Sequence, residues 1–280
     1  MKRGGKRMLT LLLFPLFLYL LILVLLFALQ TRMVFPAAAA SGTQPLPPAA
    51  ERLTLPTPDG ETLHGSLIPG RSPMNDAPTP VILGFGGNAW NADSAALTLH
   101  ELYPTADILV FHYRGYAPST GAPGAAALTA DALVIHDEAV RRSPGRPIVA
   151  VGFSVGTGVA AHLAAHRPIE GAILVTPFDD LARVAADHYP WLPIRLLFRH
   201  PMNSAARLKN SPVPVAIVAG GRDTLILPRR TDALRKSVAN LVSDRTIAGA
   251  GHNDIYNHPA FRPAMQEALA AVLKAKPHGR

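Results

Sequence analysis

The feature that most constrains this chain is a five-residue turn, residues 152–156 (GFSVG), placed between an apolar run at 147–151 and a segment rich in helix formers at 159–165. A serine between glycines in this setting is typical of the sharp strand–turn–helix connection that exposes a nucleophile at a sheet edge. The glycines avoid clashes with a strained serine backbone. The pattern predicts Ser154 as a nucleophile. The alternative is a glycine-rich turn with an incidental serine.

Two later loops carry partners for such a serine, in the chain order Ser, Asp, His that doubly wound hydrolase sheets use. Residues 214–219 predict a buried parallel strand, and Asp223 lies in the loop that follows it. His252 lies in the glycine-rich segment 249–254, after a short strand and before the last helix. Ligands bind at the carboxyl ends of strands in open α/β sheets. We therefore expect Ser154, Asp223 and His252 to meet there.

Asp223 has a rival as the acid of this group. Asp179 and Asp180 follow the strand expected over residues 172–175 and could also reach a histidine. The same pair fits a helix N-terminus, where carboxylates accept hydrogen bonds from free amides. Asp223 is therefore the preferred acid, and Asp254 is interpreted as a loop or capping residue.

Acyl transfer also requires hydrogen-bond donors for the oxyanion that forms during the reaction. Residues 81–85 (VILGF) predict a core strand, and a glycine-rich loop containing Gly87 and Asn88 follows it. We expect the backbone amides of Val155 and Asn88 to donate to the oxyanion, with Gly87 beside them. The alternative is a plain loop after a strand.

Several further short motifs occur along the chain in a fixed order, at residues 86–89 (GGNA), 113–116 (YRGY), 176–178 (TPF), 221–223 (GRD) and 251–254 (GHND). With these motifs and the serine turn, the chain resembles the α/β-hydrolase superfamily over most of residues 30 to 275. It is most similar to the membrane-anchored α/β-hydrolase domain-containing and serine aminopeptidase-like branch. The resemblance implies a mostly parallel central sheet with helices on both faces, a small cap insertion, and hydrolysis through a Ser-His-Asp triad.

The cap implied by this resemblance corresponds to residues 178–203, after the sixth strand. The segment is rich in apolar and aromatic side chains, which suit an acyl chain or a hydrophobic leaving group. We expect Tyr189, Trp191, Leu192 and Phe198 to line the substrate pocket. The alternative is that these side chains only pack on the sheet.

The N-terminus contains an uncharged apolar run over residues 9–29. A bilayer core of about 30 Å takes roughly 20 helical residues, so the run is long enough to span a membrane. Four basic residues precede the run and only Arg32 follows it nearby. This bias predicts a cytoplasmic N-terminus and an extracytoplasmic catalytic domain. Secretion after cleavage near Ala39 is the alternative, although signal-peptide apolar regions have about 7 to 15 residues.

We expect three parts along the chain. Residues 1–30 form a cytoplasmic basic tip and a transmembrane signal anchor. Residues 31–50, with several alanines and prolines, form a flexible tether. Residues 51–280 form one α/β-hydrolase catalytic domain that opens with an antiparallel hairpin around residues 58–60.

Charge and cysteine content exclude several function classes. The formal net charge is +8, but five of the 27 basic residues precede position 40, where no acid occurs. The remainder has 22 basic and 19 acidic residues, about +3, so nucleic-acid binding has little support. The chain has no cysteine, which excludes disulfides and a thiol nucleophile. No metal and no cofactor is expected, and His162 and His166 are interpreted as surface residues.

Together these observations predict a serine hydrolase that cleaves a carboxylic ester or thioester with an apolar acyl part through an acyl-enzyme. Its substrate would be a small molecule or a lipid, and its N-terminal helix would bind the membrane. A peptidase or amidase of the same fold is one alternative, and a non-catalytic membrane-tethered binding protein is another. The sequence leaves the oligomeric state open.

Overall fold

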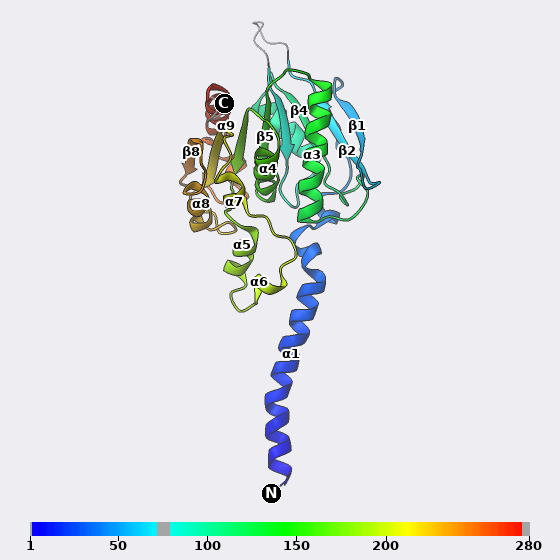
Figure 1. Ribbon diagram of the computed structural model, residues 1–280, viewed down its shortest axis with the longest axis vertical. Coiled ribbons are helices and arrows are strands. Elements are labelled where there is room, and N and C mark those ends of the chain that lie inside the picture. The colour runs from blue at the N-terminus through cyan, green and yellow to red at the C-terminus, as the bar shows by residue number, and fades with distance from the viewer. Residues whose placement is uncertain (1, 72–78, 276–280) are drawn as a thin grey trace.

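The computed structural model describes residues 2–71 and 79–275, with side chains from residue 13 onward. Within these ranges the core is an eight-stranded sheet with the strand order β1-β2-β4-β3-β5-β6-β7-β8 (Figure 1). Strands β1 and β2 pair antiparallel, β2 pairs antiparallel with β4, and all pairs from β4 to β8 are parallel. The expected α/β-hydrolase fold with an opening hairpin is confirmed. The strands are β1 (Glu51–Pro56), β2 (Thr62–Ile68), β3 (Val81–Phe85), β4 (Asp107–Phe111), β5 (Ile148–Phe153), β6 (Gly171–Val175), β7 (Val215–Gly220) and β8 (Leu241–Ile247).

Helices cover both faces of the sheet because its central strands are apolar on both sides. Every residue of β3, β5, β6 and β7 is buried. Side chains alternate along β3, so Leu83 packs in one core with Leu128 and Val159, whereas Ile82 packs in the other with Leu99. The helices are α1 (Lys2–Val34), α2 (Ala92–Leu102), α3 (Ala125–Arg142), α4 (Val155–His166), α5 (Leu181–His188), α6 (Ile194–Leu197), α7 (Ser204–Leu208), α8 (Pro228–Arg235) and α9 (Phe261–Lys274), with 3₁₀ turns η1 (Ala37–Ala40) and η2 (Ile255–Asn257).

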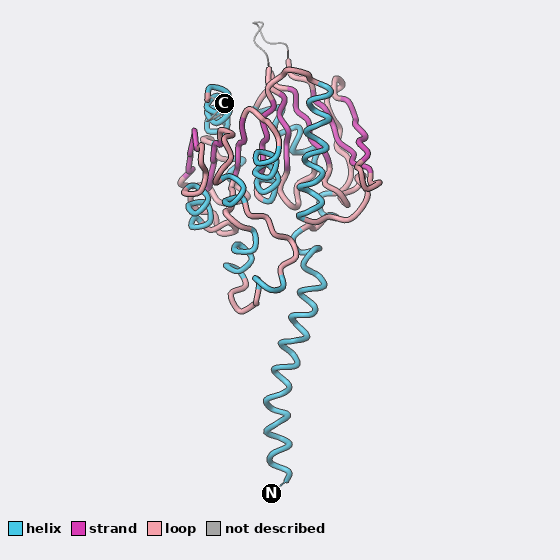
Figure 2. Tube along the Cα trace, viewed as in Figure 1, coloured by secondary structure: helices cyan, strands magenta, loops and turns pink. Residues whose placement is uncertain are grey.

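Helix α1 extends away from the domain as one continuous helix (Figure 2). Pro15 lies inside it without ending it. The described segment Leu13–Ala40 contains an apolar stretch with a mean hydropathy of 2.6, none of which is buried by the rest of the protein. A helix that is apolar all round and exposed fits a bilayer rather than water. Its length and composition make α1 a candidate membrane span.

Part of the segment expected to be a flexible tether, residues 31–50, packs against the domain. Phe35 and Ala40 are each 1% exposed. The side-chain amide of Asn91 donates hydrogen bonds to the carbonyl oxygens of Ala40 (3.2 Å) and Gly42 (2.8 Å). The alanine- and proline-rich composition suggested flexibility, but small side chains also allow close packing. Part of the stretch expected to be a flexible tether is therefore packed on the domain.

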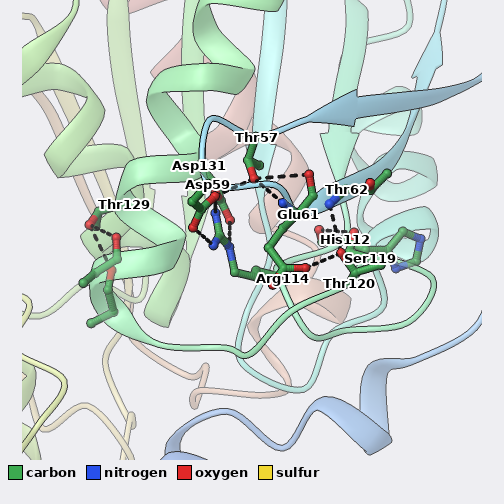
Figure 3. Close-up of polar contacts among 12 residues, drawn as sticks. Thr57, Asp59, Glu61, Thr62, His112, Arg114, Ser119, Thr120, Thr129 and Asp131 are labelled. Atoms are coloured by element: carbon green, nitrogen blue, oxygen red, sulfur yellow. Dashed lines mark hydrogen bonds and ion pairs between the residues drawn. The ribbon is translucent and has the colours of Figure 1, made fainter.

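A buried arginine fixes the loop that follows β4. The Arg114 guanidinium donates hydrogen bonds to both carboxylate oxygens of Asp59, in the β1–β2 turn, and to both of Asp131, on α3 (Figure 3). Hydrogen bonding to Arg114 holds the pKa of Asp59 well below its usual range, whereas burial raises the pKa of Asp131. The loop that carries Tyr113 and Tyr116 is thus joined to both the hairpin and a helix.

Candidate active site

Ser154 stands at the turn between β5 and α4, with backbone angles φ 52° and ψ −118°. A positive φ is strained for a residue with a side chain and persists only where neighbouring contacts hold it. Here the Ser154 amide donates to the carbonyl oxygen of Val175 (3.0 Å), and its own carbonyl accepts from the amide of Thr157 (2.9 Å). These bonds hold the turn between the end of β6 and the start of α4.

The glycines on either side of Ser154 are required by close backbone contacts. A Cβ atom at Gly152 would lie 2.4 Å from the carbonyl oxygen of Gly156. A Cβ atom at Gly156 would lie 2.1 Å from the carbonyl oxygen of Phe85, at the end of β3. Since the obstructing atoms are backbone, no side-chain rotation relieves either clash. The sequence of this turn thus follows from its geometry.

The structure brings Ser154, His252 and Asp223 together in one hydrogen-bonded chain. His252 Nε2 lies 2.9 Å from Ser154 Oγ, and His252 Nδ1 lies 2.7 Å from Asp223 Oδ2. An ionised carboxylate only accepts hydrogen bonds, so Nδ1 carries the proton and Nε2 accepts from the serine hydroxyl. This tautomer leaves Nε2 ready to take a proton from Oγ.

The carboxylate of Asp223 is held on both oxygens. Its Oδ1 accepts from the amides of Leu225 (2.9 Å) and Ile226 (2.7 Å), while Oδ2 faces His252. Asp223 is 5% exposed and His252 is 8% exposed, so water has little access to the bond between them. The carboxylate therefore has a fixed orientation toward the imidazole.

The other aspartates considered as partners of a histidine have different roles. Asp180 caps the N-terminus of α5, where its side chain accepts from two backbone amides. Asp179 Oδ2 contacts Arg183 (3.2 Å) and Arg230 (3.4 Å). Asp254 accepts from the amide of Gly251 and so tightens the loop that carries the histidine.

The loop after β3 faces the serine. A Cβ atom added to Gly87 would lie 3.7 Å from the Cβ atom of Ser154. In the described residues, the backbone amides of Asn88 and Val155 donate no hydrogen bond to a protein acceptor, and both residues line the cavity at Ser154. Both amides are therefore free to donate to a group bound in this cavity.

Two tyrosine hydroxyls bind the backbone of the loop after β3. The Tyr113 hydroxyl donates to the carbonyl oxygen of Gly86 (2.8 Å), and the Tyr116 hydroxyl donates to that of Asn88 (2.7 Å). The rings of the two tyrosines pack edge to face. The YRGY motif therefore positions the loop after β3. Arg114, which does not line the cavity, joins this motif to the β1–β2 turn and to α3.

An apolar cavity adjoins Ser154 beneath the cap. Its walls come from the cap, the loop around residue 225 and the end of α1, and they comprise Val34, Asn88, Ser154, Val155, Phe178, Leu181, Val184, Ala185, Phe198, Leu225 and Ile226. Of the four pocket residues predicted from sequence, Phe198 lines this cavity. Tyr189 and Leu192 line a neighbouring groove between the cap and α1.

Trp191 is the fourth predicted pocket residue, and it lines neither of these two spaces. Its indole packs near the ring of Tyr19 on α1, with a centroid distance of 6.4 Å. The prediction placed this side chain in the pocket over Ser154 and did not consider α1, whereas the cap tip contacts Tyr19 on that helix. Val34, Leu225 and Ile226 were missed because nothing in their local sequence marks them as pocket residues.

Comparison with known proteins agrees with this geometry. A profile described as "alpha/beta hydrolase fold" matches residues 81–213. The chain is 32% identical over 240 residues to "Uncharacterized protein Rv2307c" of Mycobacterium tuberculosis, covering 83% of this chain and 84% of that protein. It is 34% identical over 131 residues to "Lysophosphatidylserine lipase ABHD12" of Gallus gallus, covering 43% of this chain and 33% of that protein.

Solved structures show the same fold. The esterase Pf2001 of Pyrococcus furiosus superimposes with a TM-score of 0.63 at 17% identity, over 82% of this chain and 95% of that one. An α/β hydrolase of Vibrio vulnificus superimposes with a TM-score of 0.66 at 16% identity, over 87% of this chain and 91% of that one. The chain therefore belongs to the α/β-hydrolase superfamily, as a member that resembles its membrane-anchored, α/β-hydrolase domain-containing branch.

Proposed function

We propose that this protein is a serine hydrolase that cleaves a carboxylic ester or thioester with an apolar acyl part. The observation that carries the proposal is the hydrogen-bonded chain from Asp223 through His252 to Ser154, which ends beside an apolar cavity. Such a chain activates a hydroxyl because the base accepts its proton and the carboxylate stabilises the charged base.

The reaction follows from these positions. His252 Nε2 takes the proton of Ser154 as Oγ attacks the carbonyl carbon of the substrate. Asp223 stabilises the imidazolium, which then donates its proton to the leaving group as the carbon–oxygen or carbon–sulfur bond breaks. Water then attacks the acyl-enzyme as His252 takes its proton, and the acid is released when His252 returns that proton to Ser154 Oγ.

The oxyanion of each tetrahedral intermediate would accept from the backbone amides of Val155 and Asn88. The Val155 amide is the first of α4, so the positive end of the helix dipole adds to its effect. Gly87 gives the carbonyl oxygen room to approach because it has no side chain facing Ser154. Loss of one such donor in other enzymes reduces kcat by about 10²–10³-fold.

The cavity indicates the substrate class. Apart from Ser154 and Asn88 its lining side chains are apolar, which suits an acyl chain. No acidic side chain lines the described cavity, so it offers no partner for a free amine. This favours an ester or thioester over an aminopeptidase substrate. Vertebrate relatives are named lysophosphatidylserine lipases. On this basis we propose that the substrate of this protein is a lipid ester.

We further propose that α1 anchors the protein in a membrane with its N-terminus in the cytoplasm and the catalytic domain outside it. Four basic residues precede the apolar run, whereas only Arg32, in the last turn of α1, follows it nearby. Accessibility of a tag at each end of the chain, in intact and permeabilised cells, tests this orientation. The division into anchor, connecting segment and catalytic domain remains part of the proposal.

Hydrolysis of p-nitrophenyl esters by purified full-length protein tests the proposed activity. Ser154→Ala should lose at least about a thousandfold in kcat, as loss of a triad nucleophile does elsewhere. Ser94→Ala, on α2, should retain full activity. Equal hydrolysis by the Ser154→Ala variant would contradict the proposal, and absence of turnover with every ester would leave the binding-protein alternative.

A further inference from the structure

An apolar groove that has α1 as one wall adjoins the cavity at Ser154. The two spaces share Val34, Ala185 and Phe198 in their lining. On the α1 side the groove is lined by Leu23, Leu26, Phe27, Gln30, Met33 and Val34. The opposite wall is the cap, which contributes Ala185, Tyr189, Leu192, Ile194, Leu197 and Phe198. The groove thus lies beside the cavity at Ser154, between α1 and the cap.

Gln30 is the one residue of the groove with a side-chain amide, and both ends of that amide are already bonded. Its Nε2 donates to the carbonyl oxygens of Phe27 (3.0 Å) and Leu197 (3.1 Å). Its Oε1 accepts from the amide of Arg199 (2.8 Å). The amide therefore joins α1 to the cap, and the remaining lining side chains are apolar except for the hydroxyl of Tyr189.

The cap lies along the C-terminal half of the apolar run of α1 (Figure 1). The Tyr19 hydroxyl donates to the carbonyl oxygen of Trp191 at the cap tip (3.1 Å). Tyr19 precedes Leu29, the end of the run, by ten residues, which is about 15 Å along a helix. When the run spans a bilayer, the cap tip reaches below the membrane surface on the side of the domain.

The outer surface of the cap fits that location. Leu196 is 84% exposed and Trp191 is 52% exposed, and both would be costly in water but stable in lipid. Arg195 and Arg199 lie on the same segment, and long arginine side chains can extend their charge to the headgroups. The Arg199 guanidinium also packs over the Phe27 ring, 5.3 Å from its centroid. The groove therefore opens where acyl chains are present.

We propose that α1 forms part of the substrate site, and that a membrane lipid ester enters laterally with its acyl chain in the groove between α1 and the cap. The carbonyl group of the lipid then reaches Ser154 through the space bounded by Val34, Ala185 and Phe198. This inference rests on the proposed hydrolase function, because the chain occupies the groove while its ester bond lies at the serine. Activity should thus depend on α1 only for long acyl chains.

A pair of variants on α1 tests the inference in the full-length protein. Leu26 lines the groove, whereas its neighbour Leu25 is 53% exposed and points elsewhere. Leu26→Trp should reduce kcat/KM for p-nitrophenyl palmitate at least tenfold and leave p-nitrophenyl butyrate within about twofold. Leu25→Trp should change neither rate. Unchanged palmitate hydrolysis by Leu26→Trp, or an equal loss on both esters, would overturn the groove as the acyl-chain site.

A crosslinking measurement on the unmodified sequence covers the case in which the tryptophan variant misfolds. The probe is a hexadecyl fluorophosphonate with a diazirine at the chain end, added to protein in phosphatidylcholine vesicles. Irradiation should crosslink the chain end to peptides within residues 23–34 or 185–198. Labelling of Ser154 with crosslinks only elsewhere would overturn the inference alone. Failure to label Ser154 would instead overturn the proposed function.

Discussion

The hydroxyl of Tyr116 lies 2.7 Å from the backbone carbonyl oxygen of Asn88 and donates a hydrogen bond to it. Burial raises the pKa of Tyr116, so this hydroxyl stays protonated and continues to donate at all ordinary pH values. The bond fixes the loop residue whose amide is proposed to hold the oxyanion. The two residues thus couple the YRGY motif to the reaction without direct contact between Tyr116 and substrate.

Removal of that hydroxyl should reduce turnover with little effect on substrate binding. We expect Tyr116→Phe to lower kcat by about tenfold, less than the loss of a whole oxyanion donor, with KM unchanged. Tyr103→Phe is the control, since its hydroxyl also makes one hydrogen bond to a buried carbonyl, that of Met265 (3.0 Å). Steady-state kinetics of both variants test this prediction. Equal kcat values for Tyr116→Phe and Tyr103→Phe would contradict a positioning role for Tyr116.

The loss of kcat on neutralisation should distinguish Asp223 from the other aspartates near the site. Asp223→Asn should fold normally and lose about 10³–10⁴-fold in kcat, because an amide favours the wrong tautomer of His252. Asp179→Asn should change kcat less than about threefold, since Asp179 contacts Arg183 and Arg230 rather than the histidine. A larger rate loss for Asp179→Asn than for Asp223→Asn would reverse the assignment.

The two glycines around the serine should respond differently to alanine. In Gly156→Ala the new methyl group would lie 2.1 Å from the Phe85 carbonyl oxygen, and we expect a loss of about 3 kcal/mol or more in the free energy of unfolding. In Gly87→Ala the nearest atom is 3.7 Å away, so a change below about 0.5 kcal/mol is expected. Urea unfolding in detergent measures both. Similar stability of the two variants would show that the turn relaxes.

Asp93, on α2, should make stability depend on pH in the acid range. Burial alone would raise its pKa, but the His112 ring, Arg52 and the Gln44 amide together lower the pKa of Asp93 to about 2. A carboxyl in an unfolded chain has a pKa of about 3.9. Its contribution is therefore complete above pH 4 and is lost as the pH falls toward 2.

Unfolding experiments at pH 7 and pH 3 test this dependence. Asp93→Asn should be less stable than wild type at pH 7 by about 2 kcal/mol, the size that the lowered pKa of Asp93 implies. The difference should shrink as the pH approaches 2. If the stability difference between wild type and Asp93→Asn stayed constant across this range, the contacts with Arg52 and Gln44 would not lower the pKa of Asp93.

The parts that could be predicted from the sequence are those in which local chemistry decides position. The apolar run of β5, the glycines around Ser154 and the small residues of α4 specify one turn geometry within about twenty residues. Asp223 and His252 could be located because each lies after a strand, and parallel strands end at the same edge of a sheet. The geometry at Ser154 thus depends on regular secondary structure and chain order.

The contacts of α1 and the cap could not be predicted in this way. Tyr19 and Trp191 are 172 residues apart in the chain, and neither shows in its local sequence that it meets the other. The packing of Phe35 and Ala40 likewise depends on a surface formed much later in the chain. Hydrophobic contact has no preferred direction, so an apolar segment indicates that it needs a partner without indicating which one.

The most direct test of the serine chemistry is peptide mapping by mass spectrometry after treatment of the full-length protein with a fluorophosphonate. One adduct on Ser154 is the predicted result, with labelling abolished in Ser154→Ala and slowed at least a hundredfold in His252→Ala. An adduct on another residue would contradict the proposed mechanism. So would a folded wild-type protein that hydrolyses esters without forming any adduct.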